Sequence, residues 1–154
     1  MVAAKTLLRL GDTRRTLHLF DTFAGMPNPS EHDYDYSGTS AGSRVHAETG
    51  VEAYAPLDQV KRAMESTGYP RERLRYVVGR VEDTIPASAP DRIALLRLDT
   101  DWYESTRHEL VHLFPRLAVG GVLIIDHYGY WEGSRRATDE YFAQSENRIF
   151  LVRA

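Results

Sequence analysis

The chain has 154 residues, of which 42% are hydrophobic and 27% charged, a composition typical of one soluble globular domain with a buried core. The net charge of -3 argues against nucleic acid as a partner, and the lack of cysteine excludes disulfides and thiolate catalysis. No apolar run approaches the roughly 20 residues that cross a bilayer, and the first residues lack the apolar core of a secretory signal. The protein is therefore expected to be cytoplasmic, without a membrane partner.

Apolar residues follow helical spacing in some segments and form short strand-like runs in others, and glycine, proline or an acidic residue ends most of them. The predicted helices are 2–10, 57–67, 103–117 and 134–144, with a short one in 81–86. The predicted strands are 16–20, 74–79, 93–98, 122–125 and 148–152. Strands that alternate with helices predict an α/β fold with a mainly parallel sheet, built as a single domain over 1–154.

A long segment at about 22–55 is rich in Gly, Ser, Pro, Tyr and acidic residues and shows no sustained period. A loop of this length inside a compact domain is usually either functional or disordered. Residues 27–54 are therefore predicted to form a lid that closes over a ligand and excludes water. A disordered surface loop is the alternative interpretation.

Polar residues with oxygen or nitrogen ligands follow two of the predicted strands where each strand ends. Asp99 and Asp101 follow one strand, and Asp126 and His127 follow the next. Because adjacent parallel strands end at the same edge of a sheet, these side chains are expected to lie together where α/β sheets bind ligands. Carboxylate ligands favour Mg²⁺ before Ca²⁺, so the pattern predicts a metal site. The alternative is that each Asp only caps the helix that follows it.

Four segments of the chain, in their order and spacing, resemble the macrocin O-methyltransferase (TylF-type) family, which methylates sugar hydroxyls of macrolides and related natural products. The segments are 19–27 (LFDTFAGMP), 81–86 (VEDTIP), 98–106 (LDTDWYEST) and 120–129 (GGVLIIDHYG). The resemblance covers nearly the whole chain. It implies a class I, Rossmann-like methyltransferase fold that uses S-adenosylmethionine (SAM) and Mg²⁺.

The resemblance also implies roles for the residues at the two strand ends. Asp99 and Asp126 correspond to metal ligands, and His127 stands where the family often has a second Asp. Imidazole is a softer ligand than carboxylate, which would move the metal preference toward Mn²⁺. Asp101 occupies the place of the general base, which takes the proton of the acceptor hydroxyl. A helix cap is the alternative role for Asp101.

A second group of residues corresponds to the family's cofactor site. Asp21 resembles the acid that hydrogen-bonds the ribose of SAM, although it is also a natural turn residue. Glu82 and Asp83 fall where the family builds its adenine pocket. The aromatic residues of the predicted lid offer ring faces that stack on sugars.

Family members carry a further stretch before this chain, with a first strand and an acidic, glycine-rich turn that cradles the methionine part of SAM. No such turn follows a strand near the start of this sequence, so the resemblance implies a partial methyltransferase domain in which that strand and turn are missing. An incomplete sheet exposes strand edges, and the protein is accordingly expected to form a homo-oligomer.

The predicted function is SAM- and Mg²⁺-dependent O-methylation of a sugar hydroxyl on a small glycosylated natural product such as a macrolide. One alternative is a truncated, non-catalytic remnant that binds a full-length homologue. Another is a metal-dependent hydrolase that uses the same carboxylates, although the chain lacks a Gly-x-Ser-x-Gly nucleophile turn.

Overall fold

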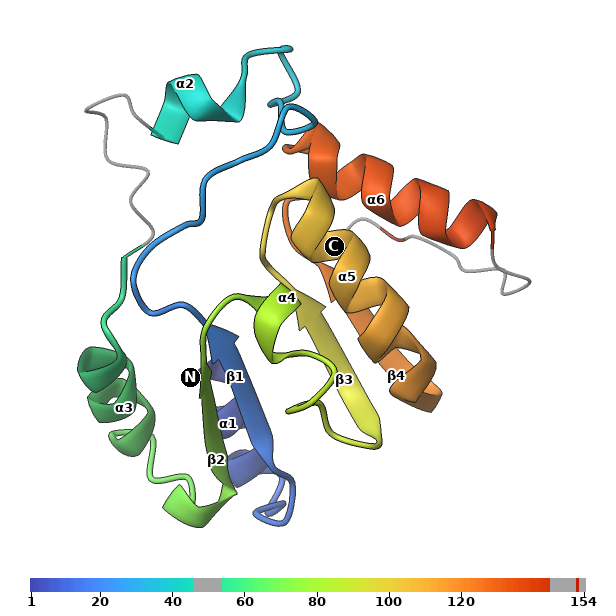
Figure 1. Ribbon diagram of the computed structural model, residues 1–154. Coiled ribbons are helices and arrows are strands. Elements are labelled where there is room, and N and C mark those ends of the chain that lie inside the picture. Colours follow the sequence, from blue (N-terminus) through green and yellow to red (C-terminus); the bar gives the residue numbers. More distant parts are fainter. Residues whose placement is uncertain (46–53, 145–151, 153–154) are drawn as a thin grey trace. The chain divides into compact units, whose positions relative to one another are not determined.

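The computed structural model describes residues 1–45, 54–144 and 152 (Figure 1). The chain divides into two compact units. The first consists of Met1–Pro27 and Glu52–Thr84, and the second of Asn28–Val51 and Ile85–Ala154. Within the described residues, no helix has the length and apolar character needed to cross a membrane. Apart from Val152, the predicted strand at 148–152 lies outside the described residues.

The first unit is built around two parallel strands, β1 and β2, which are paired from Leu17 opposite Leu74 to Asp21 opposite Val78. Its elements are α1 (Val2–Arg9), β1 (Leu17–Asp21), α3 (Leu57–Glu65), a 3-10 turn (Arg71–Arg73), β2 (Leu74–Val78) and α4 (Val81–Thr84). Ala4 of α1 and Met64 of α3 are buried together with Leu74, so that the apolar stripes of both helices pack in one core. The predicted helices and strands of this unit are all confirmed, with α3 ending two residues earlier than expected.

The second unit contains the parallel strands β3 and β4 and two long helices. Its elements are α2 (Ala41–Val45), β3 (Ile93–Leu98), α5 (Tyr103–Leu113), a 3-10 turn (Phe114–Arg116), β4 (Leu117–Ile125) and α6 (Glu132–Ala143). Helices α5 and α6 lie side by side (Figure 1). Leu110 of α5 and Ala137 of α6 are fully buried. The predicted parallel pairing is thus confirmed, in the form of one two-stranded sheet in each unit.

Two boundaries in the second unit differ from the prediction by four or more residues, whereas α6 begins two residues early and ends one residue early. Helix α5 ends at Leu113 rather than at 117, because Pro115 lacks the N–H that an α-helix requires and a 3-10 turn follows instead. Strand β4 begins at Leu117 rather than at 122, since a register shift opposite Ile93 accommodates extra residues in β4. Gly120 allows this irregularity with a φ of +77°.

Part of the predicted lid has a defined structure within the second unit. Asp33 and Asp35 are buried, with exposed fractions of 1% and 0%. Asp35 forms an antiparallel bridge with Trp131, and helix α2 follows at Ala41–Val45. A disordered surface loop is therefore the wrong interpretation for residues 28–45. The role of the segment as a lid remains a prediction.

Candidate functional site

Strands β3 and β4 end side by side, and this brings the first of the predicted ligands together. Leu98 and Ile125, the last residues of the two strands, are register partners. The Asp126 backbone N–H donates to the Leu98 carbonyl oxygen at 2.9 Å. Asp99 and Asp126 thus leave the sheet at the same edge, as the sequence predicts.

Three of the predicted residues form a compact cluster at this edge. Asp99, Asp101 and His127 each offer one ligand atom, and these atoms lie within 4.8 Å of one another. His127 Nδ1 is 2.9 Å from Asp101 Oδ1 and 3.7 Å from Asp99 Oδ1. The Asp101 side chain is only 12% exposed, whereas those of Asp99 and His127 are 40% and 49% exposed. Two carboxylates and an imidazole suit Mg²⁺ or Mn²⁺, and they are accessible to an ion.

Asp126 lies beside the cluster but is paired with a residue that the sequence reasoning missed. Arg97 of β3 forms an ion pair with Asp126 through Nη2, while its Nη1 lies 2.8 Å from Asp99 Oδ2. The guanidinium group therefore bridges two of the predicted metal ligands. The sequence does contain a sign of this pairing, because Arg97 is a charged residue within the apolar run of β3. Its side chain is exposed and therefore free to contact acidic residues at the strand ends.

The pKa values of the three carboxyl groups are shifted in different directions by their surroundings. Burial raises the pKa of Asp99 above its usual value, and Arg97 only partly offsets this effect. Burial likewise raises the pKa of Asp101, against the opposing charge and hydrogen bond of His127. Burial acts in the same direction on Asp126, but the hydrogen bond and charge of Arg97 outweigh it and the pKa is lowered. Burial thus favours the neutral form of the two clustered carboxyl groups, whereas Arg97 keeps Asp126 ionised.

The backbone at the cluster adopts an uncommon conformation. Asp101 and His127 have φ values of 65° and 55°, in a region that non-glycine residues rarely occupy. At Asp101 the chain makes a tight turn, in which the Trp102 N–H donates to the Thr100 carbonyl oxygen at 2.8 Å. Such strain persists only where neighbouring contacts hold it, and it concentrates at functional sites.

The predicted cofactor residues all belong to the first unit. Asp21 ends β1, and its Oδ1 accepts a hydrogen bond from the Phe23 N–H at 2.7 Å. The Gly79 N–H donates to the Asp21 carbonyl oxygen at 3.0 Å, so the turn after β2 meets the end of β1. Glu82 lies in α4 and forms an ion pair with Arg80 at 3.3 Å. Asp83 is exposed in the same helix.

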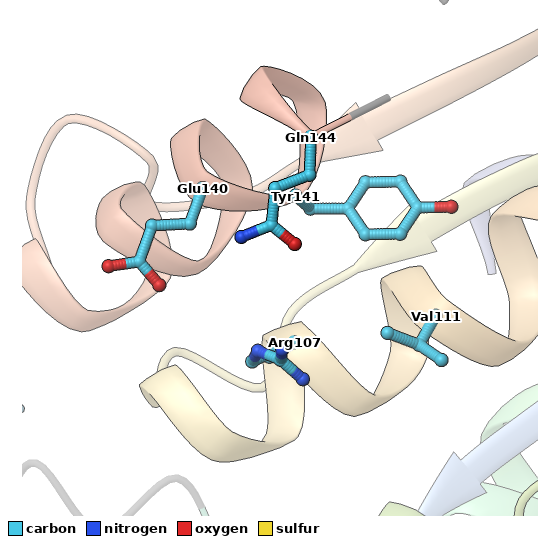
Figure 2. A pocket seen from close by; sticks show the side chains of 5 residues that line it. All are labelled: Arg107, Val111, Glu140, Tyr141 and Gln144. Atoms are coloured by element: carbon cyan, nitrogen blue, oxygen red, sulfur yellow. The ribbon is translucent and has the colours of Figure 1, made fainter. Parts of the chain in front are cut away.

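A pocket of about 310 Å³ lies elsewhere in the second unit (Figure 2). Arg107 and Val111 of α5 line one side, and the side chains of α6 and the residue after it line the other. The latter are Glu140, Tyr141 and Gln144. Its described lining contains none of the predicted site residues, so the pocket is separate from the cluster at the strand ends.

Comparison with known proteins identifies the family of this chain. The family model described as macrocin-O-methyltransferase (TylF) matches residues 1–149. The 8-demethyl-8-(2,3-dimethoxy-alpha-L-rhamnosyl)-tetracenomycin-C 4'-O-methyltransferase of Streptomyces olivaceus is 39% identical over 131 residues, which are 85% of this chain and 48% of that protein. The demethyldecarbamoylnovobiocin O-methyltransferase of Streptomyces niveus is 34% identical over 147 residues, 93% of this chain and 53% of the relative.

Solved structures agree with the sequence relatives. The O-methyltransferase NovP has a TM-score of 0.74 and 35% identity, and the match covers 91% of this chain and 57% of NovP. The calicheamicin methyltransferase CalS11 matches with a TM-score of 0.63 at 22% identity, over 92% of this chain and 58% of CalS11, which supports the fold alone. The predicted fold class is confirmed, and the chain spans about half the length of the relatives that it matches. The chain belongs to the macrocin O-methyltransferase (TylF) family.

Proposed function

We propose that the protein is an O-methyltransferase that transfers the methyl group of SAM to a sugar hydroxyl of a small glycosylated natural product, with the help of a divalent cation. The observation that carries the proposal is the cluster of Asp99, Asp101 and His127 at the strand ends of a TylF-family chain. Relatives named as methyltransferases of a rhamnosyl-tetracenomycin and of demethyldecarbamoylnovobiocin support the substrate class.

Asp99 and His127 are the cation ligands that we propose first. Their side chains are about half exposed, and their ligand atoms point to a common region. The third ligand is Asp101, which is already within this cluster, or Asp126, which would have to leave Arg97. A cation held there supplies Lewis acidity that lowers the pKa of an acceptor hydroxyl.

The proton of the acceptor hydroxyl needs a carboxylate, and Asp101 is the proposed general base. Its buried position raises its pKa, which makes it a better proton acceptor than an exposed aspartate. As long as Nδ1 carries no cation, the 2.9 Å contact between His127 Nδ1 and Asp101 Oδ1 holds the carboxylate in one orientation. Asp101 acts as the base if Asp126 completes the ligand set, and as a ligand if it does not.

The cofactor is proposed to bind through Asp21, Glu82 and Asp83. Asp21 presents an exposed carboxylate at the carboxyl end of β1, which is the position where α/β folds bind the ribose of nucleotides. Glu82 and Asp83 follow β2, whose end meets that of β1. The proposed cofactor site therefore consists of hydrogen-bond acceptors for the ribose and adenine of SAM, which lie at one edge of the first unit.

The proposal is tested by calorimetric titration of the purified protein with Mn²⁺ and with S-adenosylhomocysteine, followed by an assay with methyl-labelled SAM and a panel of glycosylated aglycones. Binding of both ligands and label transfer to a sugar hydroxyl would support the function. Cation binding without any response to the cofactor product would favour the non-catalytic remnant. Light scattering in the same samples tests the predicted homo-oligomer.

A further inference from the structure

We propose that Asp33 is a positioning residue, which holds Asp101 in the conformation that the cluster requires; this inference deepens the proposed function and rests on it. Asp33 lies in residues 30–41, which we term the bracing segment. No sequence pattern identifies this role of Asp33, because its hydrogen-bond partner Tyr103 is 70 residues away.

The Asp33 carboxylate is buried and fully engaged in the second unit. Only 1% of Asp33 is exposed. Its Oδ1 accepts a hydrogen bond from the Tyr103 backbone N–H at 2.8 Å. Its Oδ2 accepts two hydrogen bonds from Ser30, from the backbone N–H and from Oγ, each at 2.7 Å. A carboxylate that accepts from a helix N-terminus forms one of the stronger hydrogen bonds found in proteins.

This contact replaces the cap that helix α5 lacks in its own sequence. The residue before the helix, Trp102, makes no side-chain capping hydrogen bond. The Tyr103 N–H is the first donor of the helix, and Asp33 satisfies it from a distant part of the chain. The start of α5 is thereby fixed by the bracing segment.

Fixing Tyr103 also restrains Asp101, which lies two residues earlier. Asp101 occupies the strained turn in which Trp102 donates to Thr100. Relaxation of Asp101 to a negative φ would rotate the following peptides and move the Tyr103 N–H away from Asp33. The hydrogen bond from Tyr103 therefore opposes the motion that would carry the Asp101 carboxylate away from His127.

Gly133 at the start of α6 shows how closely these groups are packed. A Cβ added there would overlap Asp33 Oδ1 and would lie 2.9 Å from the Tyr103 nitrogen. Only glycine leaves room for the carboxylate between the two helices.

The bracing segment also holds the chain that follows His127. The Glu132 N–H donates to the Tyr34 carbonyl oxygen at 2.8 Å, and the Tyr36 N–H donates to the Tyr130 carbonyl oxygen at 2.9 Å. One segment thus braces the exits of both strands that carry the cluster.

The test compares Asp33→Ala, Asp33→Asn and Gly133→Ala with the control Thr138→Val. Thr138 is fully buried in α6 and its hydroxyl donates to the Ser134 carbonyl oxygen, so the substitution perturbs the same unit without removing a hydrogen bond of Asp33 or of the cluster. Mn²⁺ affinity is measured by electron paramagnetic resonance, and the ¹³Cα shift of Asp101 is measured without metal. The shift reports the backbone conformation of Asp101.

Asp33→Ala is expected to lower Mn²⁺ affinity about tenfold, the range seen when partners of metal ligands are removed, and to move the Asp101 shift. Asp33→Asn keeps an oxygen that accepts from Tyr103, and it is expected to retain more affinity. Gly133→Ala is expected to weaken binding in the native background and to add less in the Asp33→Ala background, because both changes break one contact. Thr138→Val is expected to leave both readouts unchanged.

An unmoved Asp101 shift in Asp33→Ala and Gly133→Ala, or equal loss of affinity in Thr138→Val, would overturn the proposal. If Asp33→Ala does not fold, Asp33→Asn and Gly133→Ala still decide the question. If the native protein binds no Mn²⁺, the cation part of the proposed function fails. The metal-free shift then decides the role of Asp33 independently.

Discussion

His127 Nδ1 lies 2.9 Å from Asp101 Oδ1 although the two residues are 26 positions apart, and both have a positive φ. A positive φ is uncommon for residues other than glycine, although Asp and His adopt it more often than most. The folded second unit therefore maintains the contact at a local cost. Such an arrangement is typical of a site whose groups are preorganised for binding or chemistry.

Asp99→Asn and His127→Ala are each expected to weaken Mn²⁺ binding by more than the roughly tenfold loss that follows removal of an outer partner. The reason is that each change removes a proposed direct ligand. Calorimetric titration measures the affinity, and thermal unfolding without metal shows whether the fold is kept. Glu104→Gln serves as the control, because Glu104 is an exposed acid in the first turn of α5, close in sequence to Asp99 but outside the cluster. Native affinity in both ligand variants would contradict the assignment.

Asp101→Asn and Asp126→Asn distinguish the two proposed ligand sets. If Asp101 is the general base, Asp101→Asn lowers kcat by about 10²- to 10⁴-fold while Mn²⁺ affinity changes little. If Asp101 is the third ligand, the same variant loses affinity and Asp126→Asn retains it. Measuring kcat and Mn²⁺ affinity for both variants separates these outcomes. Equal, native-like values in both variants would exclude either role for Asp101.

Arg97→Gln is expected to raise Mn²⁺ affinity a few-fold. Arg97 pairs with Asp99 and Asp126, so its positive charge opposes a cation at the same carboxylates. Arg135→Gln is the matched control, since Arg135 pairs with Glu132 and Asp139 on the exposed face of α6. The affinity difference should shrink as salt is added, because the groups are partly exposed and screening acts on them. A loss of affinity would mean that Arg97 orients the ligands rather than competing for them.

The stability of the first unit is expected to fall as the pH drops below about 6.5. Burial lowers the pKa of His18 below its ordinary value of 6.5, and within the described residues its Nδ1 is buried without a hydrogen-bond partner. The unfolded chain therefore binds the proton first, so the stability present above pH 6.5 is lost as the pH falls toward the folded-state pKa. Urea unfolding between about pH 7.5 and 5, the range in which histidine ordinarily titrates, measures how the free energy of unfolding changes with pH.

His18→Phe is expected to flatten that part of the pH dependence. The neighbouring ring offers the control, because Phe20→Leu changes the stacked partner of His18 and no titratable group. A slope that survives in His18→Phe would assign the acid sensitivity to other groups.

The sequence patterns predicted the arrangement of Asp99 and Asp126 because strand ends are local features. An apolar run shows where a strand stops, and parallel pairing then places neighbouring ends together. The pairing of Arg97 with these acids depends on side-chain conformation, and the pattern could not specify it. The early start of β4 depends on a register shift that only the paired strand reveals. The order in residues 28–45 could not be predicted, because it depends on local turns without a period and on contacts with distant residues such as Tyr103 and Trp131.

The capping of α5 by Asp33 has a consequence for how the cluster can be moved or reconstructed. The stretch from β3 to the start of α6 contains Asp99, Asp101, Asp126 and His127. Transplanted alone into another scaffold, it would carry all four groups but not the carboxylate that receives the first N–H of α5. A minimal graft must therefore be discontinuous and include residues 30–41, because the ligands and the element that shapes them are encoded far apart.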